Sequence, residues 1–128
     1  MRQELPPLPP ALVKGRNTAR LAQSAADLTA AQRLRHLCFV EQGGGRPRPD
    51  GLDRDDRDAL CRHMLIEDAR DGRLVATFRV MLLQSGAQIG QSYAARFYDL
   101  AALTRWPGPM AELGRFCVRP ALRDPDVL

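Results

Sequence analysis

Charged side chains that interrupt otherwise apolar segments are the first candidates for chemistry in this sequence. Arg79 lies in the middle of one apolar stretch, and Glu112 lies in the middle of another. Burying a charge is costly unless an opposite charge pairs with it. We therefore expect these side chains to gather around one cleft with the other charged residues that break their local pattern. The complete set is Arg33, Asp53, Asp55, Asp56, Asp58, His63, Arg79, Glu112 and Arg115.

Each of these residues has a structural explanation when it is taken alone. Arg33 and the aspartates suit a solvated face, His63 suits a core histidine with satisfied hydrogen bonds, and Arg79 suits an edge strand. The alternation of sign along the set weakens these separate explanations. It favours a shared site, in which carboxylates accept protons or bind cations and arginines bind anions.

The three cysteines are too few and too widely spaced for a disulfide framework or a CxxC metal knuckle. We interpret Cys38, Cys61 and Cys117 as small buried hydrophobic residues in a reducing compartment. Cys61 and His63 supply two zinc ligands where four are usual, and nothing marks a third group that would orient a Cys–His nucleophile. The sequence has no GxxxxGK loop either, so we expect neither a metal nor a nucleotide cofactor.

The composition is typical of a single globular domain. The 128 residues are 45% hydrophobic and 27% charged, with no apolar run long enough for a membrane span and no secretory signal. We expect a soluble, cytoplasmic protein. Its formal charge of +4 favours an acidic partner, whereas an aromatic content of only 5% disfavours a stacking platform for nucleic acid.

The elements that position the charged residues follow a proline-rich leader, residues 1–15, which we expect to be extended. Alternation predicts a strand over 17–23. Ser24-Ala25-Ala26-Asp27 has the form of a capping box, and apolar residues at helical spacing predict a helix that continues to about Val40. The apolar stripe consists of Leu28, Ala31, Leu34 and Cys38, and it leaves Arg33 and Arg35 off the apolar face.

The middle of the chain predicts a loop and then a hairpin. Glycine and proline break regular structure at 43–49, and the run 53–58 is too charged for a core, so we expect a mobile, solvent-facing loop. Strand-like segments at 63–66 and 74–83 flank a turn at Asp71-Gly72 and predict an antiparallel pair. In the second strand Val75, Thr77, Arg79 and Met81 share one face, and Ala76, Phe78, Val80 and Leu82 share the other.

The last third predicts a short helix over 94–103 and a strand over 110–118. Gly114 indicates a bulge in that strand, which would bring Glu112 and Arg115 to one side although their spacing separates them in a straight strand. Residues 123–128 have the form of the cap and first turn of another helix. Together these elements predict an α/β layer whose last strand awaits a neighbour.

Five segments resemble one group of enzymes, and the resemblance covers residues 16–128. The segments are 33–39, 53–58, 58–63, Thr77-Phe78-Arg79 and Glu112-Leu113-Gly114-Arg115-Phe116-Cys117-Val118. They resemble the ornithine N-acyltransferases that make lyso-ornithine lipid, members of the acetyltransferase-like (GNAT) superfamily that are similar to acyl-homoserine-lactone synthases. The synthases share a helical Arg, an acidic E-x-D-x-F-D loop, a strand Arg and an E-x-x-R-F strand in the same order. Arg57 departs from that pattern, in which an aromatic residue is usual.

The resemblance implies an α/β (α+β), GNAT-like fold with a mixed, mostly antiparallel sheet and flanking helices. Residues 16–128 would be its N-terminal part, with the C-terminal half missing. The implied reaction moves a (3-hydroxy)acyl group from acyl carrier protein to the α-amine of L-ornithine without a cofactor, and peripheral contact with the inner membrane face would suit its lipid product. The implied catalytic residues are Glu112 and Asp58, and the implied substrate-binding residues are Arg33, Asp53, Asp55, His63, Arg79 and Arg115.

Two alternatives stay open. The first is an acyl-homoserine-lactone synthase, which would use S-adenosylmethionine in place of ornithine, although the spacing of Asp58, Cys61 and His63 resembles the ornithine branch more closely. The second is a truncated, inactive domain that only binds acyl carrier protein, because a donor site without its second wall cannot preorganise the thioester carbonyl.

Overall fold

The computed structural model describes residues 11–120, 122 and 125–127. Its strands are β1 (Leu12–Lys14), β2 (Asn17–Leu21), β3 (Arg62–Asp68), β4 (Leu74–Leu83) and β5 (Met110–Val118). The helix α1 spans Ala25–His36 and continues into a π-helical segment at Leu37–Glu41. Short 3₁₀ segments occur at Asp58–Leu60, Gly86–Gln91, Ala94–Arg96, Ala101–Arg105 and Pro125–Val127.

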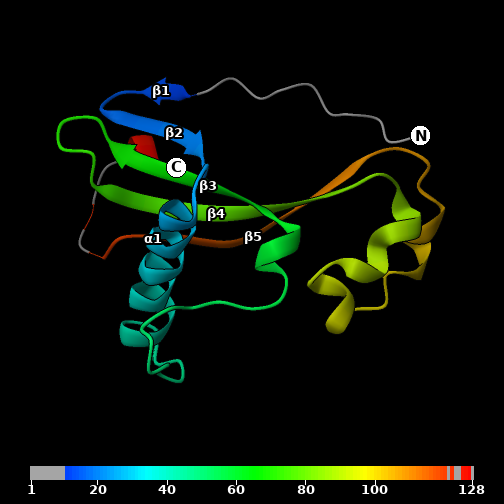
Figure 1. Ribbon diagram of the computed structural model, residues 1–128. Helices are drawn as coiled ribbons and strands as arrows, with labels where there is room; N and C mark the ends of the chain where they lie inside the picture. Colours follow the sequence, from blue (N-terminus) through cyan, green and yellow to red (C-terminus); the bar gives the residue numbers. More distant parts are fainter. Residues whose placement is uncertain (1–10, 121, 123–124, 128) are drawn as a thin grey trace.

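The strands form one sheet in the order β1-β2-β3-β4-β5, and each neighbouring pair is antiparallel. Figure 1 shows α1 on one face of this sheet and the segment between β4 and β5 extending away from it. The predicted α/β layer is confirmed, and so are the two strands of the predicted hairpin.

Strand β4 has the two faces that its sequence predicts. The face toward α1 is buried along its whole length and consists of Val75, Thr77, Arg79, Met81 and Leu83. The opposite face becomes more open along the strand, from Ala76, which is buried, to Leu82, which is exposed. The more buried face of the strand is therefore the one that carries the arginine.

A row of apolar side chains crosses the sheet on the face opposite Arg79. The register places Ala19 beside Ile66, Ile66 beside Ala76, and Ala76 beside Val118, so four successive strands contribute one residue each. Val127 packs against this row from the 3₁₀ segment at the end of the described chain. Removing these side chains from water stabilises the sheet on the side that lacks α1.

The start of α1 confirms the predicted cap. Ser24 accepts a hydrogen bond from the backbone N–H of Asp27 at 3.1 Å, and the Asp27 carboxylate accepts one from the backbone N–H of Gln23 at 2.9 Å. Arg20, on β2, donates to Asp27 and also to Glu67 on β3. These contacts anchor the first turn of the helix to two strands of the sheet.

Three expectations about local structure are wrong. Arg35 is only 1% exposed, so it lies on the inner face of α1 and not off it. The run 53–58 is not solvent-facing as a whole, because Asp58 is buried and binds residues of α1 and β4. Residues 94–103 do not form one helix. The leader is extended at Leu12–Lys14, as expected, and pairs there with β2 as an edge strand.

Part of the sequence-based prediction falls outside the described residues. The leader up to residue 10 and residues 123, 124 and 128 belong to this part, although a 3₁₀ turn is present at Pro125–Val127. Across the described ranges, no helix combines the length and the apolar character needed to cross a bilayer.

Candidate functional site

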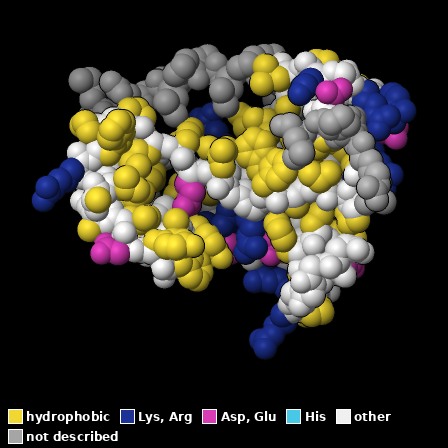
Figure 2. Space-filling view, turned by 180° about the vertical axis from the view of Figure 1, so that it is seen from behind, with side chains coloured by type: hydrophobic (Ala, Val, Ile, Leu, Met, Phe, Trp, Pro, Cys, Tyr) yellow, Lys and Arg dark blue, Asp and Glu magenta, His cyan; other side chains and the backbone are white. Residues whose placement is uncertain are grey.

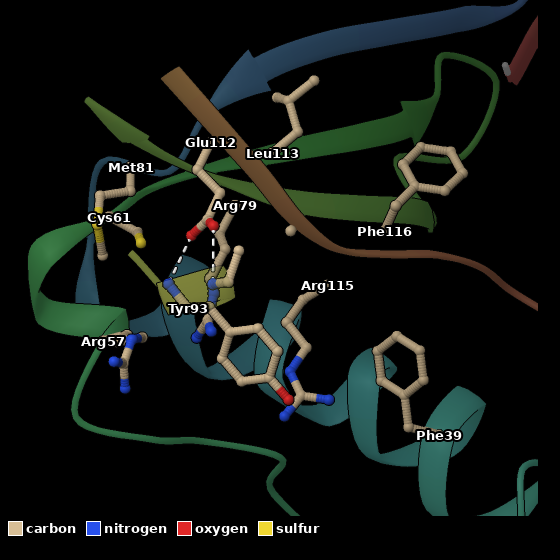
Figure 3. Close-up of a pocket in the computed structure, with 12 residues that line it drawn as sticks. Phe39, Arg57, Cys61, Arg79, Met81, Tyr93, Glu112, Leu113, Arg115 and Phe116 are labelled. Carbon is tan, nitrogen blue, oxygen red and sulfur yellow. Dashed lines mark hydrogen bonds between the residues drawn. The ribbon is translucent and has the colours of Figure 1, made fainter. Parts of the chain in front are cut away.

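A cavity of about 410 Å³ opens between β4, β5, the π-helical segment after α1, the chain just before β3 and the segment that joins β4 to β5. Figure 3 shows the side chains around it. The lining residues are Phe39, Arg57, Cys61, Arg79, Met81, Tyr93, Ala94, Glu112, Leu113, Gly114, Arg115 and Phe116. The cavity thus combines aromatic and apolar walls with three arginines and one carboxylate, a composition typical of small-molecule sites.

A bulge in β5 shapes one wall of this cavity. Thr77 lies beside Cys117 and Arg79 lies beside Gly114, so one residue of β4 faces two of β5. The predicted bulge is therefore confirmed, but its left-handed residue is Arg115, with φ of 52°, and not Gly114. The extra residue turns Glu112 and Arg115 toward the same side of the strand, as Figure 3 shows.

Asp58 is the centre of a buried ion-pair network beside the cavity. Its carboxylate accepts hydrogen bonds from Gln32 at 3.0 Å, from Arg35 at 2.7 Å and from Arg79 at 2.8 Å. Gln32 and Arg35 come from α1, whereas Arg79 comes from β4. Asp58 belongs to the run of residues 53–58, which we call the acidic loop. The network therefore joins the helix and the sheet through the acidic loop.

The donors around Asp58 keep it ionised. Burial by itself would raise the pKa of the Asp58 carboxyl, but the hydrogen bonds from Arg35, Arg79 and Gln32 outweigh it and hold the pKa below its ordinary value of 3.8. Asp58 also does not line the cavity. A buried carboxylate occupied by three donors is a poor proton acceptor, so the geometry favours a role in positioning Arg79 over the predicted catalytic role.

Two further aspartates complete the network. Asp53 accepts a hydrogen bond from Nε of Arg35 at 2.9 Å, and Asp55 accepts one from Nη1 of Arg79 at 2.6 Å. Burial favours a raised pKa for Asp55, but Arg79 lowers the pKa below its ordinary value. Arg79 therefore faces two carboxylates, which supply the partner that its mid-strand position requires.

Glu112 lies on the cavity wall and is held in place by backbone donors. Its two carboxylate oxygens accept the N–H groups of Tyr93 at 2.8 Å and of Ala94 at 3.0 Å. An ionised carboxylate has about four acceptor sites, so two N–H bonds leave room for an ammonium group or a water molecule. The contact also fixes the segment between β4 and β5 against β5.

Arg115 lies against two aromatic rings at the edge of the cavity. Its guanidinium group is 5.4 Å from the ring centre of Phe39 and 5.8 Å from that of Tyr93. Its nearest carboxylate is Asp53, at 3.8 Å. Cation–π contacts of this kind favour the charged side chain and hold its planar group in a defined orientation.

The structure brings together most of the residues that the sequence singled out. Asp53, Asp55, Asp58 and Arg79 form the network, and Glu112 and Arg115 reach the cavity beside it. His63 is buried next to the network, where its Nε2 lies 3.0 Å from the backbone oxygen of Asp58 and does not line the cavity. Arg33 does not join the site, because it is exposed on α1, and Asp56 has a side chain that is 81% exposed.

The sequence-based prediction missed several residues of the site. Gln32 and Arg35 lie on the buried face of α1 with Ala31 and Leu34. Their positions, one and four residues after Ala31, follow the helical spacing of that face and could have indicated their burial. Phe39, Arg57 and Tyr93 also line the cavity, but their positions depend on tertiary contacts that carry no local signal.

The three cysteines are free, and the thiols of Cys38 and Cys117 lie close to each other. Cys117 is buried, as predicted, whereas Cys38 and Cys61 are only partly buried. Burial raises the pKa of the Cys38 and Cys61 thiols above their ordinary value. Over the residues that can be placed, no three His, Cys, Asp or Glu side chains are grouped in a way that could hold a metal ion.

Comparison with known proteins identifies relatives of the chain. It is 38% identical to an L-ornithine N(alpha)-acyltransferase of Rhodobacter capsulatus over 79% of this chain and 42% of that protein. It is 35% identical to an L-ornithine N(alpha)-acyltransferase of Rhizobium meliloti, over 81% of this chain and 39% of that protein. It is 34% identical to an enzyme of the same name from Brucella abortus, over 81% of this chain and 41% of that protein. The chain thus spans about two fifths of the length of these curated relatives. No solved structure gives a significant match.

A family model matches most of the chain independently of these relatives. The matched residues are 34–128, and they contain the acidic loop, β3, β4, β5 and the cavity between them. The model describes an acetyltransferase (GNAT) domain. The chain therefore belongs to the acetyltransferase (GNAT) domain family.

Proposed function

We propose that the protein is an N-acyltransferase that moves an acyl group from acyl carrier protein to the α-amine of L-ornithine. The observation that carries this proposal is the similarity to four L-ornithine N(alpha)-acyltransferases, at 33% to 38% identity. The matched region includes the charged cavity, which suits an acceptor that carries both an amine and a carboxylate. The product would be lyso-ornithine lipid, an intermediate of ornithine lipid synthesis.

The chemistry of the acceptor gives a physical reason for reaction at the α-amine. An amine attacks a thioester only after it loses its proton. An α-amine has a pKa of about 8, whereas a lysine-like side-chain amine has one of about 10.4. At neutral pH the α-amine is therefore deprotonated far more often, and it is the better nucleophile of the two.

Glu112 is the residue that we propose as general base, acting through a water molecule. It lies on the cavity wall, and its two backbone hydrogen bonds hold the carboxylate in a fixed orientation. The bulge at Gly114 and Arg115 interrupts the ladder between β4 and β5, so backbone N–H groups there are candidates for binding the developing oxyanion. Arg79 is already committed to two aspartates, so of the two arginines that the sequence predicts on these strands Arg115 is the freer to bind an anionic group of either substrate.

The proposed partners follow from charge and from the product. Acyl carrier protein is acidic and would be attracted by a chain with a formal charge of +4. A cytoplasmic enzyme that contacts the inner membrane face would release its lipid product directly into the bilayer. Exposed aromatic side chains near the cavity support such a contact, notably Phe97, Tyr98 and Trp106.

The experiment is an acylation assay on the purified protein with a 3-hydroxyacyl thioester of acyl carrier protein. We expect mass spectrometry to detect N-acylornithine when L-ornithine is added. Product formation with S-adenosylmethionine in place of ornithine would instead identify a homoserine-lactone synthase. Binding of the acyl carrier protein without any turnover would support the inactive, carrier-binding alternative.

A further inference from the structure

Arg57 has an unused hydrogen-bond donor at the edge of the cavity. Its side chain is only 11% exposed, and its Nε is buried without a partner among the described residues. Its other contacts are weak: Nη2 lies 3.4 Å from the backbone oxygen of Ser92, and Nη1 lies 3.7 Å from Asp56, whose own side chain is 81% exposed. A buried cation with an unpaired donor is costly, which points to an anion that completes the site.

The other charged groups of the cavity have their partners within the protein. Arg79 pairs with Asp55 and Asp58 at 2.6 and 2.8 Å. Glu112 accepts two backbone N–H groups, and Arg115 lies against the rings of Phe39 and Tyr93. Among the arginines that line the described cavity, Arg57 is therefore the one with a buried nitrogen that has no hydrogen-bond partner.

Tyr93 places Arg57 next to the proposed reaction centre. The Arg57 guanidinium lies 5.9 Å from the centre of the Tyr93 ring, and the backbone N–H of Tyr93 binds Glu112. Figure 3 shows Arg57 and Arg115 on either side of this ring, with Glu112 above it. A cavity that presents both a carboxylate and an underused guanidinium suits a zwitterion, whose amine and carboxylate carry opposite charges.

We propose that Arg57 binds the α-carboxylate of the acceptor amino acid and thereby selects α-amino acids over other amines. The edge of the guanidinium that carries Nε and one Nη can donate two parallel hydrogen bonds to a carboxylate. This proposal rests on the proposed acyltransferase function.

The test compares L-ornithine with L-ornithinamide, which has the same amines but no carboxylate. The variants are Arg57→Met, which keeps a long apolar side chain against Tyr93, and Arg57→Lys, which keeps the charge but not the fork. We expect Arg57→Met to lower kcat/KM for L-ornithine by about 10- to 100-fold and to leave the amide nearly unaffected. For L-ornithine, the kcat/KM of Arg57→Lys should lie between those of the unmodified protein and Arg57→Met. The control is Arg54→Met, in the same loop, whose exposed side chain pairs with Asp50 away from the cavity.

The outcomes separate this inference from the proposed function. Turnover of L-ornithine with an unchanged preference for acid over amide in Arg57→Met would overturn the role of Arg57 and leave the function intact. An increase in KM for the acyl donor alone would assign Arg57 to an anion of the donor and would also overturn the inference. Absence of ornithine turnover in the unmodified protein would count against the proposed function itself.

A second measurement follows the Nε–H signal of Arg57 directly by ¹H–¹⁵N NMR on the unmodified protein. This readout keeps the test decisive if a variant fails to fold or if ornithine is not the acceptor. The signal is assigned with Arg57→Lys or by selective labelling. A shift on addition of α-amino acids but not of their amides supports the inference, and a signal that no α-amino acid shifts overturns it.

Discussion

The positive charge of Arg79 is stable inside β4 because two carboxylates of the acidic loop pair with it. Asp55 and Asp58 bind the same Nη1 atom, and Arg35 donates to the Asp58 oxygen that also binds Arg79. Cations and anions alternate through this network, so each buried charge has an opposite neighbour. Such a cluster gives little net stability compared with apolar packing, but removing one member leaves its partners buried and unpaired.

Replacing Arg79 by methionine should strongly destabilise the protein. The side chain volume is roughly kept, but Asp55 and Asp58 lose their shared donor, and we expect a loss of about 3 to 5 kcal/mol in the free energy of unfolding. Urea denaturation at neutral pH measures this free energy of unfolding. The control is Arg62→Met, on the neighbouring strand β3, where Arg62 is exposed and the change should stay within about 0.5 kcal/mol. Equal losses in the two variants would contradict a special role for the network.

The same network should make the protein sensitive to acid. The pKa values of Asp55 and Asp58 lie below their ordinary value of 3.8 in the folded protein. Their contribution to stability is therefore fully present at pH values above 3.8 and is lost as the pH falls through their lower pKa values in the folded protein. We expect the free energy of unfolding to decrease as the pH falls below about 4 and on through the lower folded pKa values. Asp58→Asn should flatten this decrease, and an unaltered slope would remove Asp58 from the acid response.

Glu112→Gln tests the proposed general base. Tyr93 and Ala94 donate to different oxygens of Glu112, so glutamine keeps an acceptor for one of these N–H groups, and it cannot take up a proton. We expect kcat to fall by about 100- to 10,000-fold with little change in KM for L-ornithine. The pH dependence of kcat is the decisive measurement, because a profile identical to that of the unmodified protein would exclude Glu112 as the base.

Close backbone contacts join the two ends of the segment between β4 and β5, the segment that contains Tyr93 and Ala94. Gly86 donates its backbone N–H to the carbonyl of Trp106 at 2.8 Å. A side chain at Gly86 would collide with the backbone carbonyl of Leu103. The two ends of this segment can therefore approach each other only because residue 86 has no Cβ.

Gly86→Ala and Gly90→Ala form a matched pair for this segment, because both glycines lie in the 3₁₀ segment Gly86–Gln91. A methyl group at Gly90 would meet open space, whereas one at Gly86 would force the backbone apart. We expect Gly86→Ala to cost about 1 to 3 kcal/mol of stability and to impair acylation, since Tyr93 and Ala94 would shift away from Glu112. Gly90→Ala should be nearly neutral. Similar losses for both would contradict the close approach at Gly86.

Regular elements with a strong local pattern were predictable, and elements set by tertiary contacts were not. The cap at Ser24, the strands β2 to β5 and the bulge near Gly114 all have local signals, and the structure confirms them. The segment 94–103 was wrongly predicted as one helix because its apolar residues do not pack on a common face, and several of them stay exposed. The charge of residues 53–58 wrongly predicted full exposure, although Asp58 is buried. Local composition cannot show that arginines from distant segments bind these aspartates.

The two faces of the sheet divide the molecule into a charged side and an apolar side. The face toward α1 holds the ion-pair network and the cavity. Figure 2, seen from behind, shows hydrophobic side chains gathered over the opposite face. Leu113 and Phe116 on β5 are 69% and 46% exposed, and both also line the cavity. The apolar wall that β5 gives to the cavity is therefore open to water.

At the scale of the whole molecule, the exposed aromatic residues between β4 and β5 should mediate contact with an anionic bilayer. Phe97, Tyr98 and Trp106 are 64%, 70% and 56% exposed, and Trp106 is the single tryptophan of the chain. Aromatic rings favour the membrane interface, and the charge of +4 attracts anionic lipids. We expect vesicles containing phosphatidylglycerol to shift the fluorescence of Trp106 to shorter wavelengths, less so at high salt or with purely zwitterionic vesicles. The double variant Phe97→Ser and Tyr98→Ser should weaken this shift, whereas a spectrum that no vesicle changes would place the aromatic segment away from the membrane.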